Sequence, residues 1–105
     1  MYIYMYYKGS SVEKSNFEWD EIKNIQNQNK HKISFIEAQY AFADTKRIIA
    51  KDVMHSSIED RYYCFGKVSG EIVTVRFTYR EQIIRIIGAG YWRKGKKIYE
   101  KENKI

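Results

Sequence analysis

Four arginines are the side chains of this sequence best suited to hold an anion: Arg61, Arg76, Arg80 and Arg85. Arg76 alternates with apolar residues, and Arg85 stands among four isoleucines. Because an arginine is costly to bury unpaired, we expect Arg85 on the same open face of a sheet as Arg76. A guanidinium forms two parallel hydrogen bonds to a phosphate, so this face is predicted to bind an anion. The alternative is a solvated face whose arginines pair with Glu71 or Glu81.

His31 is the better placed of two histidines for proton transfer. It stands between Lys30 and Lys32 at the end of a predicted helix. An unperturbed imidazole has a pKa of about 6.5, so it donates or accepts a proton near neutrality. The lysines would lower this pKa and the helix dipole would raise it. The alternative role of His31 is to cap the last carbonyl groups of the helix. His55 lies in a loop rich in serine and acidic residues and is predicted to be structural or exposed.

Two aromatic residues and four cations follow the last predicted strand in the run YWRKGKK, residues 91–97. Aromatic rings stack on nucleic-acid bases, and cations hold backbone phosphates. Alternatively, Trp92 packs beneath the last helix while the lysines are merely solvated, and for Trp92 packing is slightly favoured. The residues predicted to contact a bound polyanion are Lys30, Arg76, Trp92, Arg93, Lys94, Lys96 and Lys97.

Other kinds of site are not indicated. Cys64 lies in mid-strand between a tyrosine and a phenylalanine, so a buried thiol is expected rather than a nucleophile. As the single cysteine of the chain, it also excludes an internal disulfide and a cysteine-built zinc site. The sequence has no glycine-rich phosphate loop, paired-carboxylate motif or metal-ligand spacing. We therefore expect no metal and no cofactor.

Composition limits the class of protein. The 105 residues allow one domain, 1–105, and 44% hydrophobic residues suffice for a globular core. A net charge of +6 predicts an acidic partner: nucleic acid, an anionic membrane surface or an acidic protein. No apolar run reaches the length of a membrane span, and the opening MYIYMYY lacks the basic leader of a signal peptide. A cytoplasmic chain is expected, with no membrane partner.

Local patterns predict an α+β domain with an antiparallel sheet, two N-terminal helices on one sheet face and a C-terminal helix. Asp20 is the expected N-cap of the first helix, with Ile22 and Ile25 facing inward, and Ser34 with Glu37 forms a capping box that opens the second. Ser69 and Gly70 are expected to form a hairpin turn, and Gly88 and Gly90 to end the last strand. The predicted strands are 2–7, 46–51, 60–68, 72–79 and 83–87. The helices are 21–30, 34–42 and 94–102, and 8–16 and 52–59 are loops.

Several segments together resemble the BrnT family of small bacterial toxins, which are ribonucleases of type II toxin–antitoxin systems. The matching pieces are Phe17-Glu18-Trp19-Asp20, Lys30-His31, Ser34-Phe35-Ile36-Glu37-Ala38, Asp60-Arg61 ahead of Gly66, Thr78-x-Arg80, Arg85-Ile86-Ile87-x-Ala89 and Tyr99-Glu100. The pieces together span residues 17–100, nearly the whole chain, and their order and spacing make the resemblance specific. Two features depart from the family pattern. Gly88-Ala89-Gly90 stands where many relatives read Ser-Ala-Arg, so an arginine of the family is missing, and Arg93 or Lys94 would compensate for it. The tyrosine-rich first fifteen residues are also longer than the usual lead-in of the family.

The resemblance implies a RelE-like fold, RNA as substrate and cleavage that needs no metal. It also implies a cognate BrnA-like ribbon-helix-helix antitoxin, through which alone the chain would reach operator DNA. In this reading the 2′-hydroxyl of RNA attacks the adjacent phosphorus. The residues expected to act in the reaction are His31, or failing that a nearby lysine or tyrosine, as proton shuttle. Arg61, Arg80 and Arg85 are expected to stabilise the phosphorane. The alternative function is that of a non-catalytic basic protein that docks nucleic acid or an acidic protein.

Overall fold

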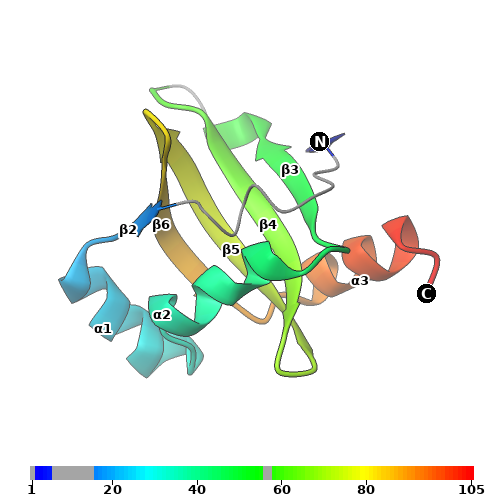
Figure 1. Ribbon diagram of the computed structural model, residues 1–105, viewed down its shortest axis with the longest axis horizontal. Coiled ribbons are helices and arrows are strands. Elements are labelled where there is room, and N and C mark those ends of the chain that lie inside the picture. The colour runs from blue at the N-terminus through cyan, green and yellow to red at the C-terminus, as the bar shows by residue number, and fades with distance from the viewer. Residues whose placement is uncertain (1, 6–15, 56–57) are drawn as a thin grey trace.

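The computed structural model describes residues 2–5, 16–55 and 58–105 (Figure 1). Its elements, in chain order, are β1 (Tyr2–Met5), β2 (Asn16–Glu18), α1 (Glu21–His31), α2 (Phe35–Ala38), the 3-10 helix η2 (Gln39–Ala43), β3 (Ile48–Asp52), the 3-10 turn η3 (Val53–His55), β4 (Arg61–Val68), β5 (Glu71–Arg80), β6 (Ile83–Gly90) and α3 (Arg93–Glu102). The strand predicted for residues 2–7 is described as far as Met5. The loop predicted for residues 8–16 lies outside the described residues except at Asn16, which begins β2.

Six strands form one sheet in the order β1-β3-β4-β5-β6-β2. Neighbouring strands are antiparallel except β2, which pairs parallel to β6, so the prediction of a purely antiparallel sheet was wrong. The three residues of β2 are too few to show an alternating pattern. They are held by packing of Phe17 against Phe42, whose ring centroids are 5.4 Å apart, and by an ion pair of Glu18.

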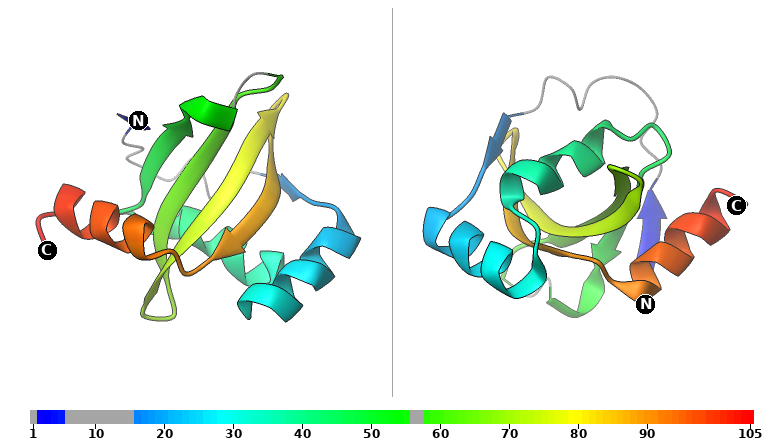
Figure 2. Two further views of the ribbon diagram at one scale, coloured as in Figure 1. Left: turned by 180° about the vertical axis from the view of Figure 1, so that it is seen from behind. Right: turned by 90° about the horizontal axis from the view of Figure 1, so that it is seen from below.

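The main core lies between one sheet face and the segment α1-α2-η2. Its largest members come from η2, β5 and α2: Phe42, Phe77 and Phe35, all at most 2% exposed. A smaller cluster on the opposite face joins Ile98 and Tyr99 of α3 to residues of β3, β4 and β5. In Figure 2 the three helices surround one end of the sheet, and the β5–β6 turn projects at the other end. Of the elements that the structure describes, α3 covers one end of this second face.

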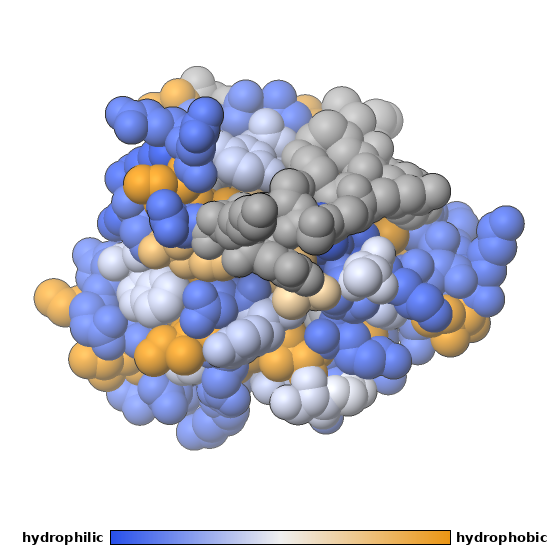
Figure 3. All heavy atoms as spheres, in the orientation of Figure 1, coloured by the Kyte–Doolittle hydropathy of each residue, from blue (hydrophilic) through white to orange (hydrophobic). Residues whose placement is uncertain are grey.

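The inward side of α1 is polar, which contradicts the prediction for Ile22 and Ile25. Asp20 is the N-cap as expected, but Ile22 and Ile25 are 68% and 53% exposed, and Asn24 is buried instead. Figure 3 shows such hydrophobic side chains interrupting a largely hydrophilic surface around α1 and α2. The buried asparagine is stabilised because its Oδ1 accepts a hydrogen bond of 2.8 Å from the backbone N–H of Phe35.

Asn27, one turn further along α1, pairs with the free edge of β6. Its side-chain amide donates to the carbonyl of Ala89 at 3.0 Å and accepts from the N–H of Ala89 at 3.2 Å. The same amide nitrogen donates to the carbonyl of Ile33 at 2.9 Å. One side chain thus satisfies three backbone groups that would otherwise lack partners, and it fixes the end of α1 against β6.

The capping box at Ser34 is confirmed, with Glu37 bonding back to the backbone N–H of Ser34. The helix continues as η2, which lies directly on β4 at Gly66. A Cβ atom on Gly66 would come within 2.3 Å of the carbonyl oxygen of Ala41, so only glycine fits this contact. Cys64 is fully buried in the neighbouring core, as predicted, and burial raises the pKa of its thiol.

The hairpin between β4 and β5 turns at Ser69 and Gly70, with φ angles of 50° and 87°, as expected for two left-handed positions. The prediction that Gly88 and Gly90 end the last strand was wrong. β6 runs through both glycines, which pair with Arg76 and Thr74 of β5, after an irregularity in register next to Phe77. Pairing with β5 therefore outweighs the weak strand propensity of glycine.

Candidate functional site

The register of the sheet places the four predicted arginines on its second face. Arg61, Thr78 and Arg85 form one cross-strand row, and Tyr63, Arg76 and Gly88 form the next. Arg80 follows Thr78 by two residues on the same face. Thr74 and Thr78 lie on the same face but are only 6% and 2% exposed. The hydroxyl of Thr78 donates to the carbonyl of Asp60 at 2.6 Å, and Thr74 lies beneath Gly95 of α3.

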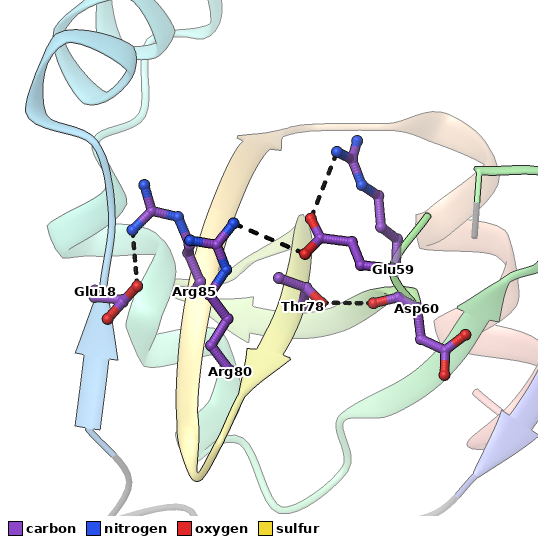
Figure 4. A network of polar contacts seen from close by, with 7 residues as sticks. Glu18, Glu59, Asp60, Thr78, Arg80 and Arg85 are labelled. Atoms are coloured by element: carbon purple, nitrogen blue, oxygen red, sulfur yellow. Dashed lines mark hydrogen bonds and ion pairs between the residues drawn. The ribbon is translucent and has the colours of Figure 1, made fainter. Parts of the chain in front are cut away.

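Three of these arginines are paired with carboxylates (Figure 4). Arg85 contacts Glu18 of β2 at 2.8 Å, while Arg61 and Arg80 contact the two oxygens of Glu59 at 3.7 and 3.8 Å. The partners are Glu18 and Glu59 rather than the Glu71 or Glu81 named as the alternative. The two carboxylates therefore offset two of the three positive charges of this arginine group, defined here as Arg61, Arg80 and Arg85.

A cleft of about 590 Å³ opens beside Arg76, between α1 and the last residues of β6. Its polar and aromatic lining comes from Lys23, Gln26, Asn27, Lys30, His31, Tyr63, Thr74, Arg76, Tyr91 and Trp92. No Asp or Glu lines it among the described residues. Arg76 forms no ion pair or side-chain hydrogen bond with any described residue, and its buried Nε has no partner. This reaction cleft, as we name it, therefore presents cations without a balancing carboxylate.

His31 lies at the mouth of the reaction cleft, as the last residue of α1. Its imidazole approaches Gly90, where an added Cβ would contact the ring at 3.7 Å. Any longer side chain at position 90 would fill the space against this ring. The glycine thus leaves the imidazole accessible from the sheet side. The expected capping role is taken by Lys32 instead, since its left-handed backbone (φ 62°) directs its N–H to the carbonyl of Gln28.

Trp92 forms the far wall of the reaction cleft. One side of its ring packs on Tyr63 and Phe65, with centroids 5.5 and 6.4 Å away, yet the side chain remains 37% exposed. Lys94 holds its Nζ 5.9 Å from the ring centroid. Trp92 is therefore packed on one side and exposed on the other, and its stacking on a nucleic-acid base stays a prediction.

A second cleft of about 550 Å³ adjoins the first across Tyr91 and Trp92, which line both. Arg93 and Lys96 of α3 line this second cleft, together with Lys67. Lys94 and Lys97 are exposed on α3 but line neither cleft. The predicted basic run is thus divided between two surfaces that share an aromatic wall.

The predicted reaction residues do not meet at one point. His31 lies beside Gly90, whereas Arg85 is five residues back along β6, roughly 16 Å at about 3.3 Å per residue, and Arg80 is further still. The cleft that His31 lines includes none of the three residues of the arginine group. Arg76, predicted only to bind, is the arginine that the structure brings toward His31.

Sequence reasoning placed Lys30 and His31 at the site but missed the contribution of Lys23 and Asn27, which lie on the same helix. Lys23, Asn27 and Lys30 line the reaction cleft at the three- and four-residue spacing of one helix face. That spacing was visible in the sequence, but the orientation of the helix was predicted from Ile22 and Ile25 instead. Tyr91 was predicted as an aromatic contact. Burial, followed by the carboxylates of Glu71 and Glu37, raises its phenol pKa above the ordinary value, so the hydroxyl is protonated at neutral pH.

Neither metal-binding nor membrane-spanning features are found where the structure is described. No three His, Cys, Asp or Glu side chains among those residues come together as a group that could hold a metal ion. None of the described helices is long and apolar enough to cross a membrane.

A basic cleft with an exposed aromatic wall on an α+β domain is a combination typical of proteins that bind nucleic acid. The model of one protein family, described as the ribonuclease toxin BrnT of type II toxin–antitoxin systems, matches residues 19–95. The chain therefore belongs to the BrnT ribonuclease toxin family, which confirms the resemblance noted above. No curated protein matches the chain.

Proposed function

We propose that this toxin cleaves RNA in the reaction cleft by attack of the RNA 2′-hydroxyl, without a metal ion. The observation that carries the proposal is that His31 and Arg76 line one cleft free of carboxylates in the described chain. A phosphate there meets cations and one imidazole. The likeness of the fold to RelE, implied by the family resemblance, remains a prediction, as does action in the cytoplasm.

The reaction is assigned to four side chains. His31 takes the proton from the 2′-hydroxyl as its oxygen forms a bond to phosphorus. Arg76 stabilises the negative charge that develops on the phosphorane oxygens. The bond from phosphorus to the 5′ oxygen breaks, and the protonated phenol of Tyr91 supplies the proton that this oxygen takes up. Lys30 holds a neighbouring backbone phosphate. The products are a 2′,3′-cyclic phosphate and a free 5′-hydroxyl.

The arginine group is reassigned in this proposal. Arg61, Arg80 and Arg85 were expected to stabilise the phosphorane, but each contacts a carboxylate, with Glu59 shared by Arg61 and Arg80 and Glu18 paired with Arg85. We assign them to holding the open end of the sheet, where Arg85 fixes β2 to β6. Arg76 takes over the catalytic role.

The test of chemistry is incubation of the folded protein with mixed-sequence single-stranded RNA in EDTA. We expect cleavage, with fragments ending in 2′,3′-cyclic phosphate and no cleavage of DNA of the same sequence. RNA that stays intact while it binds the folded protein would instead support the non-catalytic binding function. Cleavage that is lost in EDTA and restored by a divalent ion would contradict metal independence.

The test of the site compares Arg76→Gln with the matched change Arg85→Gln under single-turnover conditions. Removing one well-placed donor to a developing oxyanion lowers the rate by about 10²–10³-fold, so Arg76→Gln should lose that much at saturating RNA. Arg85→Gln should keep the parent rate within about threefold, after correction for folded protein by circular dichroism. The reverse order would return the reaction centre to the arginine group.

The partner implied by the family is a protein antitoxin, and we propose a ribbon-helix-helix protein that covers the reaction cleft. Arg76, Tyr91 and Trp92 are residue types enriched at the centres of interfaces, and the cationic cleft fits an acidic, apolar segment. Operator DNA would then be reached through the antitoxin alone. Hydrogen exchange should show protection in residues 85–97 when the antitoxin binds. Protection confined to residues 21–43 would mean that inhibition acts from the helical face.

A further inference from the structure

The second cleft differs from the reaction cleft in the charge of its lining. Lys67, Arg93 and Lys96 face two carboxylates there, Glu71 at the start of β5 and Glu100 in α3. Neither Glu71 nor Glu100 forms an ion pair or side-chain hydrogen bond with another described residue. Their oxygens are therefore available to accept hydrogen bonds from a ligand.

A carboxylate repels phosphate but accepts hydrogen bonds from the exocyclic amino group of a base. Glutamate and aspartate recognise cytosine in this way, through its N4 amino group, whereas uracil offers an acceptor oxygen at the same place. Lys67, Arg93 and Lys96 supply the charge that holds the backbone of the same nucleotide. The cleft, at about 550 Å³, is within the range of small-molecule sites, roughly 300–1,000 Å³.

The two clefts share Tyr91 and Trp92, so a single strand that enters one continues into the other. Trp92 is supported from behind by Tyr63 and Phe65 and exposes the rest of its ring, which makes it a platform for stacking. A paired base hides its amino group in hydrogen bonding and cannot stack on a protein ring. The arrangement therefore suits an unpaired strand.

We propose that the second cleft is a nucleotide subsite that selects, next to the cleaved phosphate, an unpaired base bearing an exocyclic amino group. Glu71 and Glu100 are its specificity residues, and Trp92 separates this base from the reaction cleft. The subsite rests on the proposed function for its place beside the reaction, but its selectivity is a property of binding and is measured without cleavage.

The test uses 2′-O-methyl hexanucleotides, which cannot be cleaved because their 2′ oxygens carry no proton. Oligocytidylate and oligouridylate have the same number of phosphates, so the ratio of their dissociation constants cancels the general electrostatic attraction. One good base contact discriminates by about tenfold, so oligocytidylate should bind about ten times more tightly at neutral pH. The double variant Glu71→Gln/Glu100→Gln should reduce this ratio to below threefold, because an amide donates to uracil as readily as it accepts from cytosine.

Glu81→Gln is the matched control, since Glu81 lies in the exposed β5–β6 turn and lines neither cleft. It should leave the ratio at about ten. Equal affinities of the parent for both hexamers, or a ratio unchanged in the double variant, would overturn the inference. If the parent protein discriminates between the hexamers but does not cleave RNA, the proposed function would be contradicted and the subsite would still be supported.

Discussion

The amide of Asn27 is expected to contribute more to stability than any exposed side chain of α1. Replacing it by alanine removes three hydrogen bonds, of 2.9, 3.0 and 3.2 Å, to the backbone of Ile33 and Ala89. Each such bond contributes about 1 kcal/mol, so the free energy of unfolding should fall by about 3 kcal/mol. With a urea dependence of about 1.5 kcal/mol per molar for a small domain, the midpoint should fall by about 2 M.

The assay is equilibrium unfolding in urea followed by circular dichroism, with Gln26→Ala as the matched control. Gln26 is the exposed neighbour of Asn27 in the same helix, and its replacement should change stability by less than about 0.5 kcal/mol. An Asn27→Ala variant within about 0.5 kcal/mol of the parent would refute the idea that this amide fixes α1 to β6. A change in slope rather than midpoint would also contradict it.

Three further changes test the packing described above. Gly66→Ala should lower the free energy of unfolding by about 3 kcal/mol, because the added methyl meets a backbone oxygen of η2; differential scanning calorimetry measures this. Thr78→Val should cost about 1–2 kcal/mol in urea unfolding, because it leaves a carbonyl without its 2.6 Å donor. Burial and a hydrogen bond to Asp44 raise the pKa of Tyr99 above its ordinary value of 10.0, so stability should be complete below pH 10 and fall above it. Tyr99→Phe should flatten that fall in unfolding measurements between pH 8 and 11; an unchanged slope would exclude Tyr99 as its cause.

Local signals were sufficient for most of the elements. The alternation of Val73, Val75 and Phe77 predicted β5, and Ser69 with Gly70 predicted its hairpin. Asp20 and Ser34 predicted where the two N-terminal helices begin, because a cap acts within a few residues of itself. Each of these features depends on neighbours in the chain, which the sequence displays directly.

The features that were missed depend on partners far away in the sequence. Glu18 meets Arg85 across 67 residues, and Asn27 meets Ala89 across 62, so neither contact leaves a local pattern. The spacing of apolar residues predicted that Ile22 faces inward, because a prediction from such spacing assumes that the buried face of a helix is hydrophobic. Here Asn24 is buried and Asn27 is half-buried on that face, since both satisfy backbone groups of other segments.

The same non-local contacts separate what could be predicted of the site from what could not. Alternation along β5 correctly placed Arg76 on the open face, yet it could not reveal that Arg80 and Arg85 are paired with carboxylates. The reaction cleft depends on how α1 meets β6, and no stretch of sequence encodes that meeting by itself. The predicted catalytic set was consequently divided, and Arg76 was moved from binding to chemistry in the proposal.

The position of β1 and β2 at opposite edges of the sheet has a consequence for the order of folding. The hairpins β4–β5 and β5–β6 close over a few residues, so the entropy lost in forming them is small. β2 must instead wait for β6, and Glu18 leaves the ribosome long before its partner Arg85 is made. A nascent chain therefore carries β2 without its partner until β6 is made, whereas β1 can pair with β3 earlier in synthesis. Since pairing across such sequence distances is slow, we expect the joining of β2 to β6 to be among the last steps of folding.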